Sequence, residues 1–244
     1  MKTGAKTDIG QVRKLNEDSL NVVITDSYTY AIVADGMGGH LAGEIASSMA
    51  VNIITEYIDK NIKPEMDRFQ VKEIIHRAFK KANEDIYQYS CDNDSAMGMG
   101  TTTTLCMVRD GYIIYAHVGD SRAYVFTDKA EQITRDHSFV QELVKLGEIT
   151  PEEAKHHPRR NYITRAMGVE NIVRIDTGVR PYAGEDILLC SDGLIGEIED
   201  KELFEAVKKY EPTECAEYLV DLANQRGGSD NITVIVLKGE NTDE

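Results

Sequence analysis

The order of its apolar patterns constrains most strongly how this chain can fold. Two strand patterns at 19–25 and 29–35 are separated by a short turn, and two helical patterns follow, over 41–58 and after Pro64. In the helical patterns apolar residues recur at spacings of three and four, which is typical of one face of an α-helix. In the first third of the chain, two expected strands are therefore followed by two expected helices.

The same grouping returns further along the chain. The expected strands are 101–108, 112–118, 122–127, 172–180, 186–191 and 232–237, and the expected helices are two short ones within 138–161 and longer ones near 199–210 and 213–226. Arg109-Asp110-Gly111 is a hairpin signal between two of these strands. Because single strands and single helices do not alternate, the sequence predicts an α+β fold, with antiparallel sheets covered by helix pairs.

Composition limits the class of protein. The 244 residues suit one domain over 1–240, with the tail at 241–244 expected to fray. A formal net charge of −15 argues against a nucleic-acid binder and against docking on anionic membranes. The sequence begins with no apolar secretory signal, and no apolar run approaches the ~20 residues that span a bilayer. We therefore expect a cytoplasmic protein, and a monomer because the sequence shows no coiled-coil pattern and no exposed apolar stripe.

Twice in the sequence, an expected strand is followed directly by an aspartate and small residues. A related Ser-Asp-Asn motif occurs once more, directly before the last expected strand. Asp35 and Asp192 each end an apolar run and precede a glycine, and Asp230 opens the closing strand. Carboxylates at the ends of buried strands are costly unless they are paired or bind a cation, and Mg²⁺ and Mn²⁺ prefer oxygen ligands. A glycine such as Gly36 also lets its own carbonyl turn toward an ion. The alternative for each aspartate alone is an ordinary turn or helix cap.

Two further segments carry candidate groups. Arg13 is followed five residues later by Asp18, a spacing that could place a phosphate clamp beside an acid that organises a metal site. Asp120 follows the strand at 112–118 and is flanked by small residues. Each also has a plain alternative, a solvated loop for Arg13 and a β-turn for Asp120.

Taken together and in order, these motifs resemble the metal-dependent PPM/PP2C protein phosphatases, specifically their compact bacterial branch. The matching motifs are Arg13 with Asn16-Glu17-Asp18, residues 35–40, 100–102, 119–122, 191–193 and 229–233. The resemblance implies the family's four-layer α-β-β-α sandwich. It also implies hydrolysis of phosphoserine and phosphothreonine, the activity of a protein-serine/threonine phosphatase. The bacterial members that it most resembles oppose Hanks-type serine/threonine kinases.

The resemblance also assigns roles to individual residues. Asp35, Asp192 and Asp230 match the ligands of a first Mn²⁺ or Mg²⁺ ion, and Asp35 with the Gly36 carbonyl matches those of a second. Asp120, with Asp192, matches a third metal site of bacterial members. Arg13 matches the arginine that binds the substrate phosphate, and Asp18 matches the acid that holds metal-bound water. A water bridging the two ions would lose a proton and attack phosphorus directly.

Some roles stay open within the family pattern. Eukaryotic members carry a histidine after the first Asp-Gly pair, whereas this chain has Met37, which cannot donate a proton to the leaving alcohol. His40 is the nearest candidate for that role or for a substrate contact. The segment 138–161 matches the flap of bacterial members, which lies beside the active site. Phosphorylated proteins, among them a cognate kinase, are the partners that the resemblance implies.

Two other functions remain open at this stage. A relative without catalytic activity could use the same fold to bind phosphoproteins, although every metal-ligand position here is filled by a suitable residue. A hydrolase of small phosphate esters could use the same site. Activity on a phosphopeptide compared with small phosphorylated metabolites would separate these two from a protein phosphatase.

Overall fold

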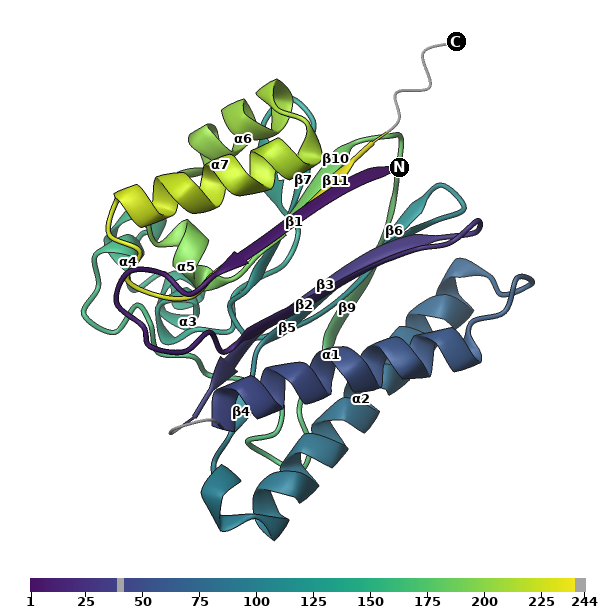
Figure 1. Ribbon diagram of the computed structural model, residues 1–244, viewed down its shortest axis with the longest axis horizontal. Coiled ribbons are helices and arrows are strands. Elements are labelled where there is room, and N and C mark those ends of the chain that lie inside the picture. Colours follow the sequence, from purple (N-terminus) through teal and green to yellow (C-terminus); the bar gives the residue numbers. More distant parts are fainter. Residues whose placement is uncertain (39–41, 240–244) are drawn as a thin grey trace.

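The computed structural model describes residues 1–38 and 42–239. Two antiparallel sheets lie face to face, with helices α1 and α2 outside one sheet and helices α6 and α7 outside the other (Figure 1). The predicted four-layer α-β-β-α sandwich is thus confirmed. No helix in the described part of the chain is long and apolar enough to cross a membrane.

The first sheet is built from the hairpins of the amino-terminal half. Its strands, in spatial order, are β2 (Asp18–Ile24), β3 (Thr29–Met37), β5 (Thr103–Arg109), β6 (Tyr112–Val118) and β9 (Asp176–Pro181), and β4 (Gly100–Thr101) pairs with β3. The predicted hairpin between β5 and β6 turns at Asp110 and Gly111, whose φ angles of 49° and 72° are those of a two-residue hairpin turn.

The second sheet joins the two ends of the described chain. Its strands, in spatial order, are β1 (Lys2–Asp8), β11 (Ile232–Lys238), β10 (Asp186–Cys190), β7 (Arg122–Phe126) and β8 (Ala130–Gln132). The first strand therefore pairs with the last, from Lys2 opposite Lys238 to Asp8 opposite Ile232. Neither β1 nor β8 was expected from the sequence.

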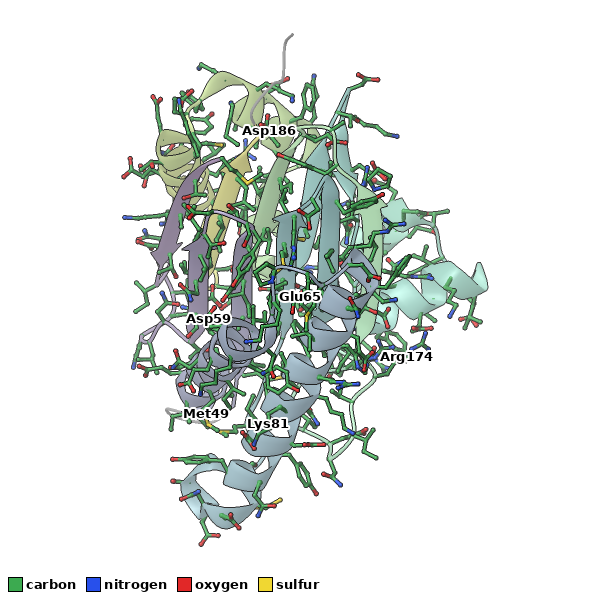
Figure 2. All side chains as sticks on the ribbon, turned by 90° about the vertical axis from the view of Figure 1, so that its right-hand side faces the viewer. Met49, Asp59, Glu65, Lys81, Arg174 and Asp186 are labelled. Atoms are coloured by element: carbon green, nitrogen blue, oxygen red, sulfur yellow. The ribbon has the colours of Figure 1, made fainter. Side chains whose placement is uncertain are left out.

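Helices cover the outer faces and carry the insert. Their bounds are α1 (Ala42–Asn61), α2 (Arg68–Asp92), α3 (Phe139–Leu146), α4 (Pro151–Lys155), α5 (Asp192–Ile195), α6 (Asp200–Lys209) and α7 (Pro212–Gln225), with a 3₁₀ turn η1 at Asp94–Ala96. The expected break within 138–161 is confirmed, since Gly147 ends α3 with a φ of 75° and Thr150 begins α4 with a capping box. Met49 and Lys81, labelled low in Figure 2, belong to α1 and α2.

Three apolar layers separate the four layers of secondary structure. Alternate residues of one strand enter different layers, as the two-residue period of a strand requires. On β3, Tyr30 and Ile32 pack toward α1 and α2, whereas Ala31 and Val33 pack between the sheets. β11 divides its residues in the same way between the inter-sheet layer and the layer beneath α6 and α7. Because the central strands β5, β10 and β11 are buried on both faces, polar side chains on them require a specific reason.

Candidate active site

Asp18 and Asp35 face each other across the β2–β3 ladder. Asp18 is buried, and its Oδ2 accepts hydrogen bonds from Ser191 Oγ at 2.8 Å and Thr233 Oγ1 at 2.6 Å. These hydroxyls come from the second sheet, so Asp18 links the two sheets at their common end. Burial raises the pKa of Asp18 to about 7, and the two hydroxyl donors oppose that rise because they favour the carboxylate.

The second sheet contributes two more of the predicted carboxylates. Asp192 begins α5 directly after β10, and Asp230 lies just before β11, which is hydrogen-bonded to β10. Burial, followed by the charge of Asp230, raises the pKa of Asp192. Asp230 itself accepts a hydrogen bond from the Asn231 backbone N–H at 2.8 Å. The two strand-end motifs therefore meet at one edge of this sheet.

Electrostatic interactions join all five predicted carboxylates into one group. The pKa of Asp35 is raised well above its usual range, first by burial and then by the charges of four neighbouring aspartates. These neighbours are Asp18, Asp192, Asp120 and Asp230. The structure therefore brings together side chains that lie as far apart in the chain as positions 18 and 230, and it takes them from both sheets.

The donors of this group fit hard divalent cations. One carboxylate oxygen of each of three aspartates, Oδ1 of Asp18, Asp120 and Asp192, is buried without a hydrogen-bond partner. Buried carboxylate oxygens without partners are costly in a protein unless a cation neutralises them. Oxygen donors of this kind are those that Mg²⁺ and Mn²⁺ prefer. The donor set therefore suits a metal centre.

The carboxylates are nevertheless not arranged as a closed chelate. Within residues 1–38 and 42–239, no group of three or more His, Cys, Asp or Glu side chains is gathered so that it could hold an ion by itself. The shared ligation of one ion by Asp35, Asp192 and Asp230 thus stays a prediction. Mg²⁺ commonly binds through one or two carboxylates and keeps several waters, so a looser set is compatible with such an ion.

Gly36 and Gly119 show why small residues accompany two of these aspartates. A Cβ on Gly36 would overlap the carbonyl of Gly43 at the start of α1, and the Gly36 N–H donates to the Glu17 carbonyl at 3.1 Å. Gly119 has a φ of 110°, and a Cβ there would overlap the side chain of Thr102. Both positions therefore require glycine, which lets the backbone turn tightly next to Asp35 and Asp120.

Arg13 lies at the rim of the carboxylate group. Its side chain is about half exposed (48%), and its Nη2 donates to Asp230 Oδ2 at 2.6 Å. The contact places a guanidinium beside a predicted metal ligand while leaving part of it open to solvent. This position suits an arginine that binds an oxyanion near a metal centre.

Residues 10–225 match a family model described as protein phosphatase 2C. The chain belongs to the protein phosphatase 2C family. The serine/threonine phosphatase stp of Listeria monocytogenes serotype 4b (strain F2365) is 39% identical over 241 residues, which are 97% of this chain and 95% of that protein.

Solved structures agree with this family. The serine/threonine phosphatase Stp1 from Staphylococcus aureus has a TM-score of 0.91 and 35% identity, over 98% of this chain and 95% of that one. The catalytic domain of the serine/threonine protein phosphatase PstP, solved with two manganese ions, has a TM-score of 0.81 and 35% identity, over 96% of both chains. The fold and the dependence on metal that the family implies therefore apply to this protein phosphatase 2C chain.

The loop that carries Arg13 depends on a residue whose role was not predicted. Asn231 is 4% exposed, and its Nδ2 donates to the carbonyls of Ile9 at 3.0 Å and Leu15 at 2.9 Å. Its Oδ1 accepts from the Glu17 N–H at 2.9 Å. Asn231 belongs to the Ser-Asp-Asn motif of this phosphatase family, but only the folded chain shows that it fastens the loop at 9–17.

Two histidines of this phosphatase, at positions 40 and 117, differ in what the structure describes of them. His40, the candidate proton donor, lies outside the described residues. His117 is a core residue whose ring is satisfied, with Nδ1 2.8 Å from Thr104 Oγ1 and Nε2 3.1 Å from the Arg135 carbonyl. Burial lowers the pKa of His117 to about 4, so its ring stays neutral.

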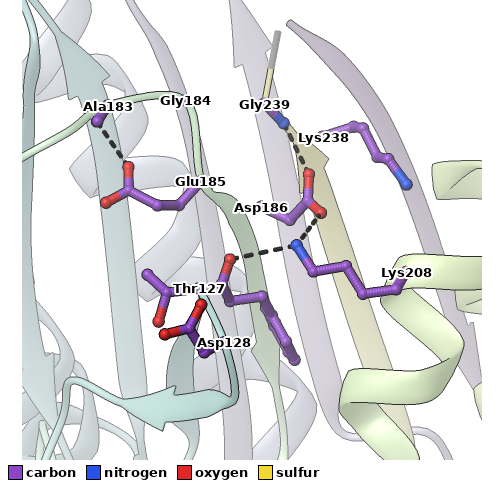
Figure 3. Close-up of a pocket in the computed structure, with 10 residues that line it drawn as sticks. Thr127, Asp128, Ala183, Gly184, Glu185, Asp186, Lys208, Lys238 and Gly239 are labelled. Atoms are coloured by element: carbon purple, nitrogen blue, oxygen red, sulfur yellow. Dashed lines mark hydrogen bonds and ion pairs between the residues drawn. The ribbon is translucent and has the colours of Figure 1, made fainter. Parts of the chain in front are cut away.

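A cavity of about 500 Å³ lies away from the carboxylate group (Figure 3). Asp186, which lines it, starts β10, whereas Asp192 follows the other end of that strand. The Asp186 carboxylate binds Lys208 Nζ at 3.2 Å and the Gly239 N–H at 3.1 Å. The Asp186 carboxylate is thus already neutralised by partners within the protein. In this it differs from the buried carboxylate oxygens near Asp192, which have no hydrogen-bond partner.

Proposed function

We propose that this protein is a metal-dependent protein phosphatase that hydrolyses phosphoserine and phosphothreonine in proteins. The observation that carries the proposal is the convergence of five aspartates from both sheets, with Arg13 at the rim. A centre rich in carboxylates, with one arginine at its rim, suits metal-assisted hydrolysis by water rather than a covalent enzyme intermediate.

The proposed metal ligands are the predicted ones. Asp35, Asp192 and Asp230 would hold one ion, and Asp35 with the Gly36 carbonyl would hold a second. Asp120 and Asp192 would hold a third, for which the buried oxygens of both residues without partners are the support. When bound, Mn²⁺ or Mg²⁺ supplies an activated water and neutralises charge on the phosphoryl group. Asp18, fixed by Ser191 and Thr233, would orient the water molecules of this centre.

Arg13 is the proposed phosphate ligand. Its guanidinium presents five donors, of which one binds Asp230, so the others remain available to the oxygens of a phosphoryl group. Charge that develops on those oxygens during transfer is stabilised best by a donor already in place. Asn231 contributes indirectly, because it holds the loop from which Arg13 extends.

The remaining expectations are proposals of the same kind. Residues 1–240 form one catalytic domain, and the insert at 138–161 acts as a flap that contacts substrate. His40 contacts the substrate or donates a proton to the leaving alcohol. The protein acts as a cytoplasmic monomer, as the cysteines without disulfide partners suggest for the compartment, and it reverses the action of a serine/threonine kinase of the Hanks type.

The deciding experiment is hydrolysis of a phosphothreonine peptide by the pure protein, with Mn²⁺ and then with EDTA. We expect turnover that needs the metal and that is lost in Asp35→Asn. Asp221→Asn is the matched control, because Asp221 is exposed on α7, away from the carboxylate group. A protein that binds Mn²⁺ but releases no phosphate would contradict the proposal and favour a binding role.

A further inference from the structure

His137 holds the turn that presents Asp120. It is 4% exposed, and its backbone N–H donates to the Gly119 carbonyl at 2.7 Å. In return, the Gly119 N–H donates to Nδ1 of the His137 ring at 3.0 Å. Both peptide groups that flank Gly119 are therefore bonded to one residue.

The turn at Gly119 leaves little freedom for the residue that follows. Its φ of 110° and its close packing against Thr102 fix the path of the backbone. Asp120 comes next, is 6% exposed, and has one carboxylate oxygen without a hydrogen-bond partner. The direction of that carboxylate thus depends on the orientation of the peptide groups at Gly119, which His137 sets.

The same histidine also lies at the base of the insert. The His137 carbonyl accepts from the Thr164 N–H at 2.8 Å, where the chain returns from the insert. Its neighbour Ser138 pairs with Ile163 and caps α3. A shift of the base of the insert would therefore also move His137, which is hydrogen-bonded to Gly119.

The far side of the ring is fixed as well. Nε2, on the side of the ring away from Gly119, lies 3.2 Å from Asp176 Oδ2 and 2.8 Å from Arg165 Nη1. Arg165 Nη1 binds the other oxygen of Asp176 at 3.0 Å. Asp176 on β9 thereby anchors the ring to the first sheet, and the ring has one orientation.

We propose that His137 is a positioning residue, which transmits the position of the insert at 138–161 to the carboxylate of Asp120. This inference rests on the proposed function, in which Asp120 is a metal ligand. Seating of the insert, for example on a bound phosphoprotein, would orient Asp120 for an ion. Displacement of the insert would turn the Asp120 carboxylate away from the ion and lower the affinity for that ion.

Two substitutions separate the hydrogen bond from Gly119 to Nδ1 from the contact of Nε2 with Asp176. In His137→Asn the side-chain oxygen can lie near the position of Nδ1 and accept the Gly119 N–H. In His137→Gln the longer side chain reaches toward Asp176 instead and leaves the Gly119 N–H unpaired. Both variants should fold, because the Arg122–Asp136 ion pair at 2.7 Å still fastens this segment.

Mn²⁺ binding measured by calorimetry is the first measurement, since it does not depend on turnover. We expect His137→Gln to weaken the weakest Mn²⁺ site about tenfold, as an unpaired buried N–H would, while His137→Asn stays within about threefold of the parent. Hydrogen exchange should quicken in peptides covering 117–122 and the insert in His137→Gln alone. Its kcat should fall about tenfold, with KM for the phosphopeptide changed less than about twofold.

Asp120→Asn gives the decisive comparison. If His137 acts through Asp120, adding His137→Gln to Asp120→Asn should cause no further loss of Mn²⁺ binding. Equal effects of the glutamine and asparagine variants, or full additivity with Asp120→Asn, would overturn the inference. If the parent binds Mn²⁺ yet hydrolyses no phosphopeptide, the proposed function fails, and the binding and exchange data still decide the role of His137.

Discussion

Replacing Asn231 with alanine tests how the loop that carries Arg13 is held. The substitution removes two donors, to the carbonyls of Ile9 and Leu15, and one acceptor, for the Glu17 N–H. An intramolecular hydrogen bond contributes about 1 kcal/mol net, and a buried group left unpaired costs about 1–3 kcal/mol. Three such bonds at a position 4% exposed give an expected loss of about 3 kcal/mol in the free energy of unfolding.

Urea unfolding followed by circular dichroism measures that loss as a lower midpoint at unchanged slope. The KM for a phosphothreonine peptide should rise as well, because the released loop no longer holds Arg13 at the rim. Asn52→Ala is the matched control: Asn52 is exposed on α1 and makes one bond, to Ser48 Oγ at 3.3 Å, so its loss should stay within about 0.5 kcal/mol. A loss below about 1 kcal/mol for Asn231→Ala, with KM unchanged, would refute the reasoning.

Three other predictions concern the carboxylate group. Asp192→Ala should abolish nearly all phosphatase activity in Mn²⁺, since it removes a ligand of two proposed sites, and retained turnover would contradict the assignment. Arg13→Ala should raise KM for phosphopeptides about tenfold or more while the unfolding midpoint changes little; an unchanged KM would exclude the phosphate role. In EDTA, the raised pKa of Asp18 means that the folded state retains a proton that the unfolded state releases. Stability should therefore fall as pH rises from about 4 to 7. Asp18 contributes up to about 1.4 kcal/mol per pH unit to this slope, and Asp18→Asn should make the slope shallower by that contribution in calorimetric scans.

The layers of this fold are predictable because apolar periodicity identifies the elements that build its core. The missed elements are those with weak periodicity. β1 reads Lys-Thr-Gly-Ala-Lys-Thr-Asp and becomes a strand because it pairs along its whole length with β11. β8 has three residues, of which none is β-branched, and follows β7 through a turn. Both are edge strands, where pairing with a neighbour outweighs local preference.

Strand ends were also less regular than the sequence suggests. Asp35 was expected to end its strand, but β3 continues to Met37 because Gly36 and Met37 pair with β4. The expected strand at 172–180 begins only at Asp176. In both places a distant partner decides where the strand begins or ends, and a local pattern carries no information on that partner.

The residues of the candidate site likewise fall into those that the sequence predicts and those that only tertiary contacts identify. The aspartates could be found from the sequence because a charged residue after a buried strand is conspicuous. The residues that hold them could not: Ser191 and Thr233 bind Asp18 across 173 and 215 positions. Asn231 and His137 act on backbone groups, which look the same at every position of a sequence. Their roles follow from tertiary contacts alone.

The pairing of β1 with β11 has a consequence for how activity arises during folding. The loop that carries Arg13 leaves β1, and Asp230 leads into β11, so one strand pairing between distant parts of the chain brings the arginine to its aspartate. Pairings of this separation are slow, since a long loop must close before any contact compensates for the lost entropy. Partly folded molecules with the other layers in place would consequently be inert toward phosphoproteins.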